Sequence, residues 1–137
     1  MYILDTNVLS ETRRSRKAHP SIRRWFASVD ASELFLSVIS IFEREMGVRR
    51  MERRDMKQAA ILRVWLQDRV LDAFKGRILP VDIEVSIRCA GLHVPDPRPF
   101  RDSFIAATAM AYDMTVVTRN VADFVATGVP ILNPWDF

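Results

Sequence analysis

The chain has 137 residues, of which 49% are hydrophobic, and this predicts one folded domain spanning residues 1–137 rather than a disordered polypeptide. Its 20 Lys and Arg residues against 17 Asp and Glu give a formal net charge of +3, which by itself supports solubility and no specific partner. The single cysteine, Cys89, excludes an internal disulfide, and with no secretory signal and no apolar run near the roughly 20 residues that cross a bilayer, we expect a cytoplasmic, non-membrane protein.

Short apolar runs alternate with helical patterns along the chain, which is typical of the α/β class. In chain order, the predicted elements are a strand at 2–4, a helix from about 20 to 29, a strand at 34–38, helices at 40–54 and 56–74, a strand at 77–81, a helix at 82–92, a proline loop at 94–99, a helix at 100–112, a strand at 115–118, a short helix at 120–125 and a strand at 129–132. Because the strands are short, apolar and separated by helices, we expect a parallel sheet covered on both faces.

One basic cluster is nearly free of acidic residues: Arg13, Arg14, Arg16 and Lys17. Such a cluster can serve solubility or can contact nucleic-acid phosphates. Charge alone favours the solubility interpretation, and the segment from Arg13 to Lys17 could equally face RNA or a protein partner.

Several acidic and amide side chains fall where predicted strands end or where the following helices begin. Asp5 ends the first strand, and Thr6-Asn7 is expected to turn the chain. Glu43 and Asp102 lie in the first turns of their predicted helices, and Asn120 and Asp123 follow the fourth strand. Ligands of open parallel sheets bind outside the carboxyl ends of the strands, so these side chains can converge on one cleft.

Each of these residues also has a purely structural interpretation. Ser40 and Glu43 have the spacing of a capping box, and Asn120 could cap a helix that carries Asp123 in its first turn. Asp102 would interact favourably with its helix dipole. Taken singly, capping is the better interpretation for Glu43 and Asp123, whereas Asp5 is divided evenly between a turn and a site.

Taken together, the carboxylates favour a functional interpretation. Negative groups a few ångströms apart repel one another, and such a cluster persists by sharing protons or by holding a cation. Oxygen ligands without Cys or His suit Mg²⁺, or Mn²⁺ as a substitute. A Mg²⁺ site of this kind can activate water for phosphodiester hydrolysis, and a basic surface could then hold the nucleic-acid backbone.

The sequence also resembles the PIN-domain nucleases, in particular VapC-type toxins of the FitB-like branch. The resemblance rests on the order and spacing of LDTNVLSE, SVISIFE, GRILPVD, FRDSFIAATAMAYDMTVVTRN, VADF and NPWDF along nearly the whole chain. It implies a three-layer α/β/α fold with a short parallel sheet and Mg²⁺-dependent endoribonuclease activity, with tRNA among the candidate substrates. It also implies neutralisation by a cognate antitoxin, contact with operator DNA through that antitoxin, and a homodimer.

By position, the resemblance assigns Asp5, Glu43 and Asp102 as the first three site acids, with Asp5 and Asp102 as direct metal ligands. The fourth position is open, because relatives often carry Asp where this chain has Asn120, and Asp123 is the other acidic candidate. Thr118 and Asn7 are expected to support the site or to make ordinary turn hydrogen bonds. Outside the resemblance, His19 and His93 are expected to be surface or loop residues, and Trp25, Trp65 and Trp135 to be core or interface anchors.

Two other functions compete with a ribonuclease. A phosphatase with an aspartate nucleophile would also begin from a strand-end Asp, but it needs a second acid two residues later, where this chain has Asn7. A non-catalytic partner in a DNA-binding regulatory complex is the alternative from another class, and the intact set of Asp5, Glu43 and Asp102 argues against it.

Overall fold

The computed structural model describes the backbone of residues 1–137 and every side chain except that of Ser15. A parallel sheet lies at its centre, with the strand order β3-β2-β1-β4-β5. The strands are β1 (Tyr2–Leu4), β2 (Leu34–Ser37), β3 (Ile78–Leu79), β4 (Thr115–Val117) and β5 (Ile131–Leu132). The predicted α/β class and parallel sheet are confirmed, although most strands are shorter than expected.

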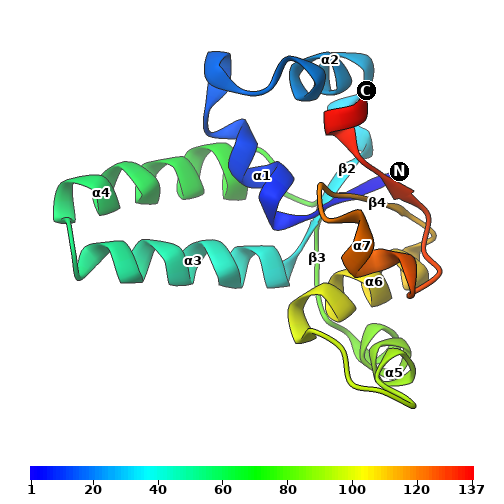
Figure 1. The fold of residues 1–137 in the computed structure, drawn as a ribbon. Coiled ribbons are helices and arrows are strands. Elements are labelled where there is room, and N and C mark those ends of the chain that lie inside the picture. Colours follow the sequence, from blue (N-terminus) through cyan, green and yellow to red (C-terminus); the bar gives the residue numbers. More distant parts are fainter.

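Helices cover both faces of the sheet and give three layers (Figure 1). They are α1 (Thr6–Thr12), α2 (Pro20–Ser28), α3 (Val38–Glu52), α4 (Met56–Trp65), α5 (Ile83–Leu92), α6 (Phe100–Tyr112) and α7 (Val121–Val125), with short 3-10 turns at Ser15–Lys17, Ala31–Glu33 and Pro134–Asp136. Buried residues of α1, α2 and α3 form the core on one face, and those of α6 and α7 form the core on the other. In the part of the chain that the structure describes, no helix is long and apolar enough to cross a membrane.

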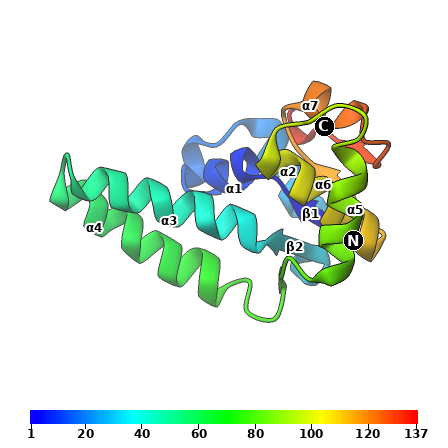
Figure 2. The same ribbon diagram turned by 90° about the horizontal axis from the view of Figure 1, so that it is seen from below.

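Helices α3 and α4 form an antiparallel hairpin that extends away from the sheet in both views (Figures 1 and 2). An ion pair joins the two helices: the Arg63 guanidinium donates to both carboxylate oxygens of Glu45, and Nη2 lies 2.8 Å from Oε2. Arg63 also approaches Glu52 at 3.3 Å. This hairpin begins at β2, so its first turns lie beside the edge where β1 and β4 end.

Two helix starts differ from the prediction. Thr6 and Asn7 do not form a turn but begin α1, because the Asp5 side chain accepts a hydrogen bond from the Thr6 amide at 2.7 Å and caps the helix. Helix α3 starts at Val38, with the Ser37 hydroxyl accepting from the Ile39 amide at 3.0 Å. The predicted capping box at Ser40 is therefore wrong, and Ser40 lies inside the helix.

The predicted single helix 56–74 changes geometry partway. The chain is α-helical to Trp65 and continues as a π-helical segment, Leu66–Asp72, whose Leu66 and Val70 side chains are fully buried. The helical run stops before Gly76, which has φ +81° and supplies the left-handed conformation that ends it without strain.

Candidate active site

The predicted site residues gather where β1 and β4 end. The two strands are neighbours, with Leu4 opposite Val117, so Asp5 and Thr118 follow them side by side. Glu43 comes from α3, and Asp102 lies in the first turn of α6. Strands from both ends of the sequence and two helices therefore build one acidic site.

Asp5 is the most enclosed of these acids, with 5% of its surface exposed. The Thr118 hydroxyl donates to Oδ2 at 2.8 Å, the Asn7 amide donates to the same oxygen at 3.3 Å, and the Thr6 backbone amide donates to Oδ1. Burial raises the pKa of Asp5 above its ordinary value, and the bonds from Thr118 and Thr6 oppose that rise. The carboxylate is held in one orientation, as a group that binds a ligand requires.

Glu43 does not cap its helix. Its Oε1 accepts from the Thr6 hydroxyl at 3.0 Å, and the Ser40 hydroxyl lies 3.1 Å from the same Thr6 oxygen. Thr6 therefore links α1 to α3 and directs Glu43 toward the end of β1. This role of Thr6 was missed in the sequence, where a Thr after a strand-end Asp is indistinguishable from a turn residue.

Asp102 carries the clearest electrostatic signature of the site. Burial raises its pKa to about 6, and the charges of Asp5, Asp123 and Glu43 contribute in that order, while Arg101 opposes them. Asp102 thus lies within the electrostatic field of three other carboxylates. The structure brings together the acids that the sequence singled out.

The fourth position remains divided between Asn120 and Asp123. Asn120 occupies the N-cap position of α7, but its side chain makes no capping hydrogen bond, and its backbone amide donates to the Thr118 hydroxyl at 2.9 Å. The predicted cap is therefore wrong in its chemistry. Asp123 lies in the first turn of α7, exposed and within the field of Asp5 and Asp102.

The donor set suits a hard divalent cation that keeps part of its water shell. Among the described side chains, no three Asp, Glu, His or Cys groups stand close enough to enclose an ion by themselves. Mg²⁺ is usually held through one or two carboxylates, with water and substrate oxygens filling the other positions. Asp5, which is buried and hydrogen-bonded, and Asp102, which is repelled by the other acids, fit that mode of binding.

A hollow of about 390 Å³ opens on the α6 side of the acids, and its walls include Glu43, Phe100, Arg101 and Asp102. Arg101 Nη1 lies 3.8 Å from Glu43 Oε2, and its guanidinium stands over the Phe42 ring, 5.7 Å from the centroid. Arg101 was not predicted as a site residue, although its place directly before Asp102 in the sequence was a usable signal.

His93 has a structural role that its loop position did not suggest. Its Nε2 lies 2.9 Å from the Ser103 hydroxyl, and its Nδ1 accepts from the Arg98 amide at 3.3 Å. His93 thereby ties the proline loop to the residue after Asp102. His19 is exposed and accepts from the Ser21 amide at the start of α2, in agreement with a surface position.

The tryptophans behave as predicted anchors. Trp25 is buried, and Trp65 and Trp135 pack against the same core on the face of α1 and α2.

Comparison with known proteins places this geometry in a family context. Residues 2–128 match the model of the PIN domain. A relative from Sinorhizobium fredii named VapC ribonuclease Y4jK is 35% identical, with 99% of each chain covered. Toxin FitB from Neisseria gonorrhoeae is 34% identical, covering 98% of this chain and 99% of that one. The crystal structure of FitAcB from Neisseria gonorrhoeae superposes with a TM-score of 0.90 at 32% identity over the whole of both chains.

Proposed function

The chain belongs to the PIN domain family, and from this premise we propose that it is a Mg²⁺-dependent endoribonuclease that acts as the toxin of a toxin–antitoxin pair. The relatives named VapC ribonuclease and Toxin FitB, which align over nearly the whole chain, support this proposal. The observation that carries it is the convergence of Glu43, Asp102 and Asp123 on buried Asp5 at the carboxyl ends of β1 and β4.

In this mechanism Asp5 and Asp102 would hold Mg²⁺ directly, Glu43 would complete the site, and Asn120 or Asp123 would fill the fourth position. The bound ion would activate a water molecule and neutralise charge on the scissile phosphate. Thr118 and Thr6 orient the Asp5 carboxylate, and Thr6 also orients Glu43. Mn²⁺ can substitute, because it accepts the same oxygen ligands.

An RNA cleavage assay with the purified protein tests the proposed ribonuclease activity. We expect cleavage of total RNA and tRNA in Mg²⁺ or Mn²⁺, and its loss in Asp5→Asn and Asp102→Asn, which keep the shape of each side chain but remove its charge. Asp113→Asn is the matched control, because Asp113 is exposed at the opposite end of α6 and has φ 54°, a conformation that Asn tolerates. Circular dichroism should show the same fold in all four proteins.

A wild-type protein that cleaves none of these RNAs in either metal would favour the alternative, a non-catalytic partner in a DNA-binding toxin–antitoxin complex. In that case the antitoxin complex should still form and bind its operator DNA. Retained cleavage in Asp5→Asn would instead reject the metal site described above.

The proposed toxin activity and its neutralisation by an antitoxin can be tested in bacterial cells. Expression of the chain alone should arrest bacterial growth, and coexpression of the small neighbouring gene product should relieve the arrest. Normal growth at good expression would count against a toxin.

We further propose a homodimer, which light scattering of the purified protein can test.

A further inference from the structure

A second hollow, of about 450 Å³, has several basic side chains in its lining. Arg14 and Lys17 come from the segment after α1, His19 from the start of α2, and Arg119 from the link between β4 and α7. The ring of Trp135 forms another wall. Arg14 and Lys17 belong to the basic cluster at residues 13–17, to which the sequence alone assigned no specific partner.

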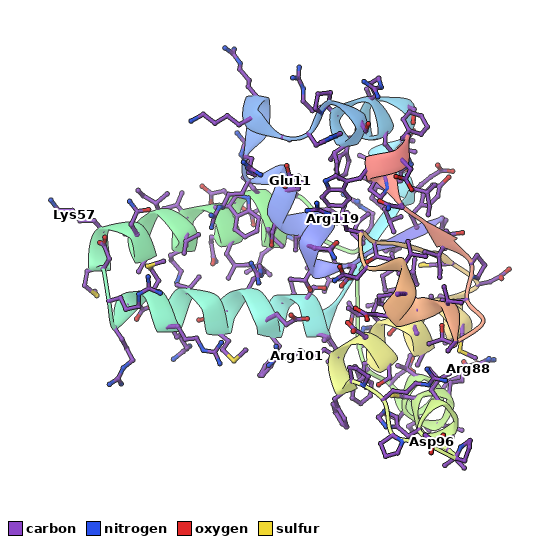
Figure 3. The ribbon with its side chains drawn as sticks, in the orientation of Figure 1. Glu11, Lys57, Arg88, Asp96, Arg101 and Arg119 are labelled. Atoms are coloured by element: carbon purple, nitrogen blue, oxygen red, sulfur yellow. The ribbon has the colours of Figure 1, made fainter. Side chains whose placement is uncertain are left out.

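Arg119 connects this hollow to the acidic site. Its backbone amide donates to the Asn7 side-chain oxygen at 3.4 Å, and the Asn7 amide donates in turn to Asp5. In sequence it stands between Thr118, which holds Asp5, and Asn120. In Figure 3 Arg119 and Glu11 lie beside α1, whereas Arg101 lies where α3 meets α6. Arg101 directly precedes Asp102 and Arg119 directly follows Thr118, so the two arginines flank the site residues from different elements.

The charges in the hollow are largely uncompensated. Glu11 is the acid in its lining, and it approaches Arg14 at 3.6 Å. Among the described side chains, neither Lys17 nor Arg119 has an ion-pair partner. Uncompensated cations at the edge of a carboxylate cluster raise the local concentration of a polyanion that the carboxylates alone would repel.

The geometry of Arg119 suits a phosphate. Its guanidinium stands over the Trp135 ring, 5.2 Å from the centroid, which limits the motion of a long side chain before any ligand arrives. A planar, oriented guanidinium can donate two parallel hydrogen bonds to a phosphate, which a lysine ammonium cannot do. The Arg101–Phe42 pair repeats this arrangement beside Glu43.

We propose that the hollow formed by Arg14, Lys17, Arg119 and Trp135 is a subsite for backbone phosphates of the RNA strand flanking the scissile bond. The strand runs from this subsite across the carboxylates toward the Arg101–Phe42 pair, with Arg119 as the main positioning residue. This inference rests on the proposed function for the identity of the polyanion. An acidic segment of a protein partner is the competing occupant. The substrate is favoured because Arg119 directly follows Thr118, and its backbone amide is linked through the Asn7 side chain to Asp5.

The experiment measures binding of a fluorescein-labelled, uridine-rich RNA of about 20 nucleotides by anisotropy at several salt concentrations. All proteins carry Asp102→Asn, which prevents cleavage. We expect Arg119→Ala to weaken binding about tenfold and to reduce the salt dependence by about 0.7 in log–log slope, the value for one phosphate contact with a single strand. Adding Lys17→Ala should reduce both further. Arg119→Lys, which keeps the charge, should recover part of the affinity.

Arg88→Ala is the matched control, because Arg88 is also an exposed arginine, lies on α5, pairs with Glu84 and is distant from Arg119 in Figure 3. It should bind RNA as the Asp102→Asn background does. In proteins with Asp102 restored, Arg119→Ala should raise the KM for RNA cleavage with little change in kcat, because it removes binding shared by the ground and transition states. Equal thermal melting of the Arg119 variants would exclude a folding defect.

Unchanged affinity and salt slope in Arg119→Ala would overturn the subsite. So would normal RNA binding combined with loss of the antitoxin complex, because the hollow would then belong to the protein partner. If the wild type binds RNA through Arg119 but cleaves none, the proposed function fails, and the hollow stands only as a binding site for RNA phosphates. If it cleaves RNA without dependence on Arg119, the subsite fails and the function stands.

Discussion

Asp102 shows how burial and neighbouring acids disfavour a negative charge at a single residue of the site. Its carboxyl is partly buried and faces three other acids, and its pKa of about 6 follows from burial first and from their repulsion second. A cation bound among them would reverse this effect, because it favours the ionised form. Proton and metal ion therefore compete for the same oxygens.

This competition predicts a pH dependence of metal binding. Because the folded pKa of Asp102 is raised to about 6, the carboxyl is protonated below that pH and must lose its proton before it binds a metal ion. We expect Mg²⁺ affinity to fall about tenfold for each pH unit below 6 and to change little between pH 7 and 8. Isothermal titration calorimetry across pH 5–8 measures this directly. A flat profile would show that Asp102 does not bind the ion.

Thr118 offers a second test at the same scale. Thr118→Val keeps the shape of a fully buried side chain but removes the hydroxyl that donates to Asp5 Oδ2 at 2.8 Å. Because that bond opposes the raised pKa of Asp5, its loss should raise the pKa further and weaken Mg²⁺ binding roughly tenfold, as is typical when a supporting hydrogen bond is removed.

Thr108→Val is the control for that substitution. Thr108 is equally buried, but its hydroxyl donates to the Phe104 carbonyl inside α6. Mg²⁺ binding that is weakened as much by this variant as by Thr118→Val would mean that general destabilisation, and not the bond to Asp5, is responsible.

Sequence position was enough to single out Asp5 and Asp102 as candidates, because both stand at predictable ends of strongly apolar or alanine-rich elements. It was not enough for Thr6 and Arg101. Their importance depends on contacts between elements far apart in sequence, such as the 3.0 Å bond from Thr6 to Glu43. No local pattern encodes such a contact.

At the scale of elements, the start of α3 decides what Glu43 can do. With Ser37 as the cap, Ser40 and Glu43 lie within the helix and are free to contact Thr6 from α1. A cap at Ser40 would have used Glu43 to satisfy a backbone amide instead. A three-residue difference in helix start therefore separates a structural glutamate from a candidate ligand.

This assignment of the cap can be measured. Ser37→Ala removes the acceptor for the Ile39 amide and should lower the free energy of unfolding by about 1 kcal/mol, the usual cost of losing a serine cap. Urea denaturation followed by circular dichroism gives the value. Ser40→Ala should cost less, because Thr6 keeps its bond to Glu43. A larger loss of stability in Ser40→Ala than in Ser37→Ala would show that Ser40, and not Ser37, caps the helix.

The elements differed in how well the sequence predicted them. Helix α6 has the predicted bounds, because a proline loop precedes it and Asp113, in the left-handed region, follows it. Helix α1 was missed since it has only seven residues and its cap is the strand-end Asp5. The π-helical segment 66–72 was missed because its apolar positions also fit an ordinary α-helix.

At the scale of the whole molecule, folding gathers carboxylates that are about a hundred residues apart in the chain. The unfolded state does not impose this repulsion, so the metal-free fold carries its cost. Between the ordinary Asp pKa of 3.8 and the raised value of about 6, the folded protein binds more protons at Asp102 than the unfolded chain does. Stability from this source is therefore greatest below pH 4 and falls as the pH rises through 6.

The last prediction follows from that sign. At pH 7.5 without metal, Asp102→Asn should stabilise the fold by about 1 kcal/mol, a figure reduced from the full pKa shift because the group is only partly buried. At pH 4 the gain should vanish, since the wild-type carboxyl is then protonated. Mg²⁺ at about 100 times its dissociation constant should stabilise the wild type by about 2.7 kcal/mol and the variant far less. Thermal melting in EDTA and in Mg²⁺ at both pH values measures all three effects, with Asp113→Asn as the control. A variant that is less stable than the wild type at pH 7.5 in EDTA would mean that the carboxylates are not in conflict, and the main physical reason to place a metal ion among them would be lost.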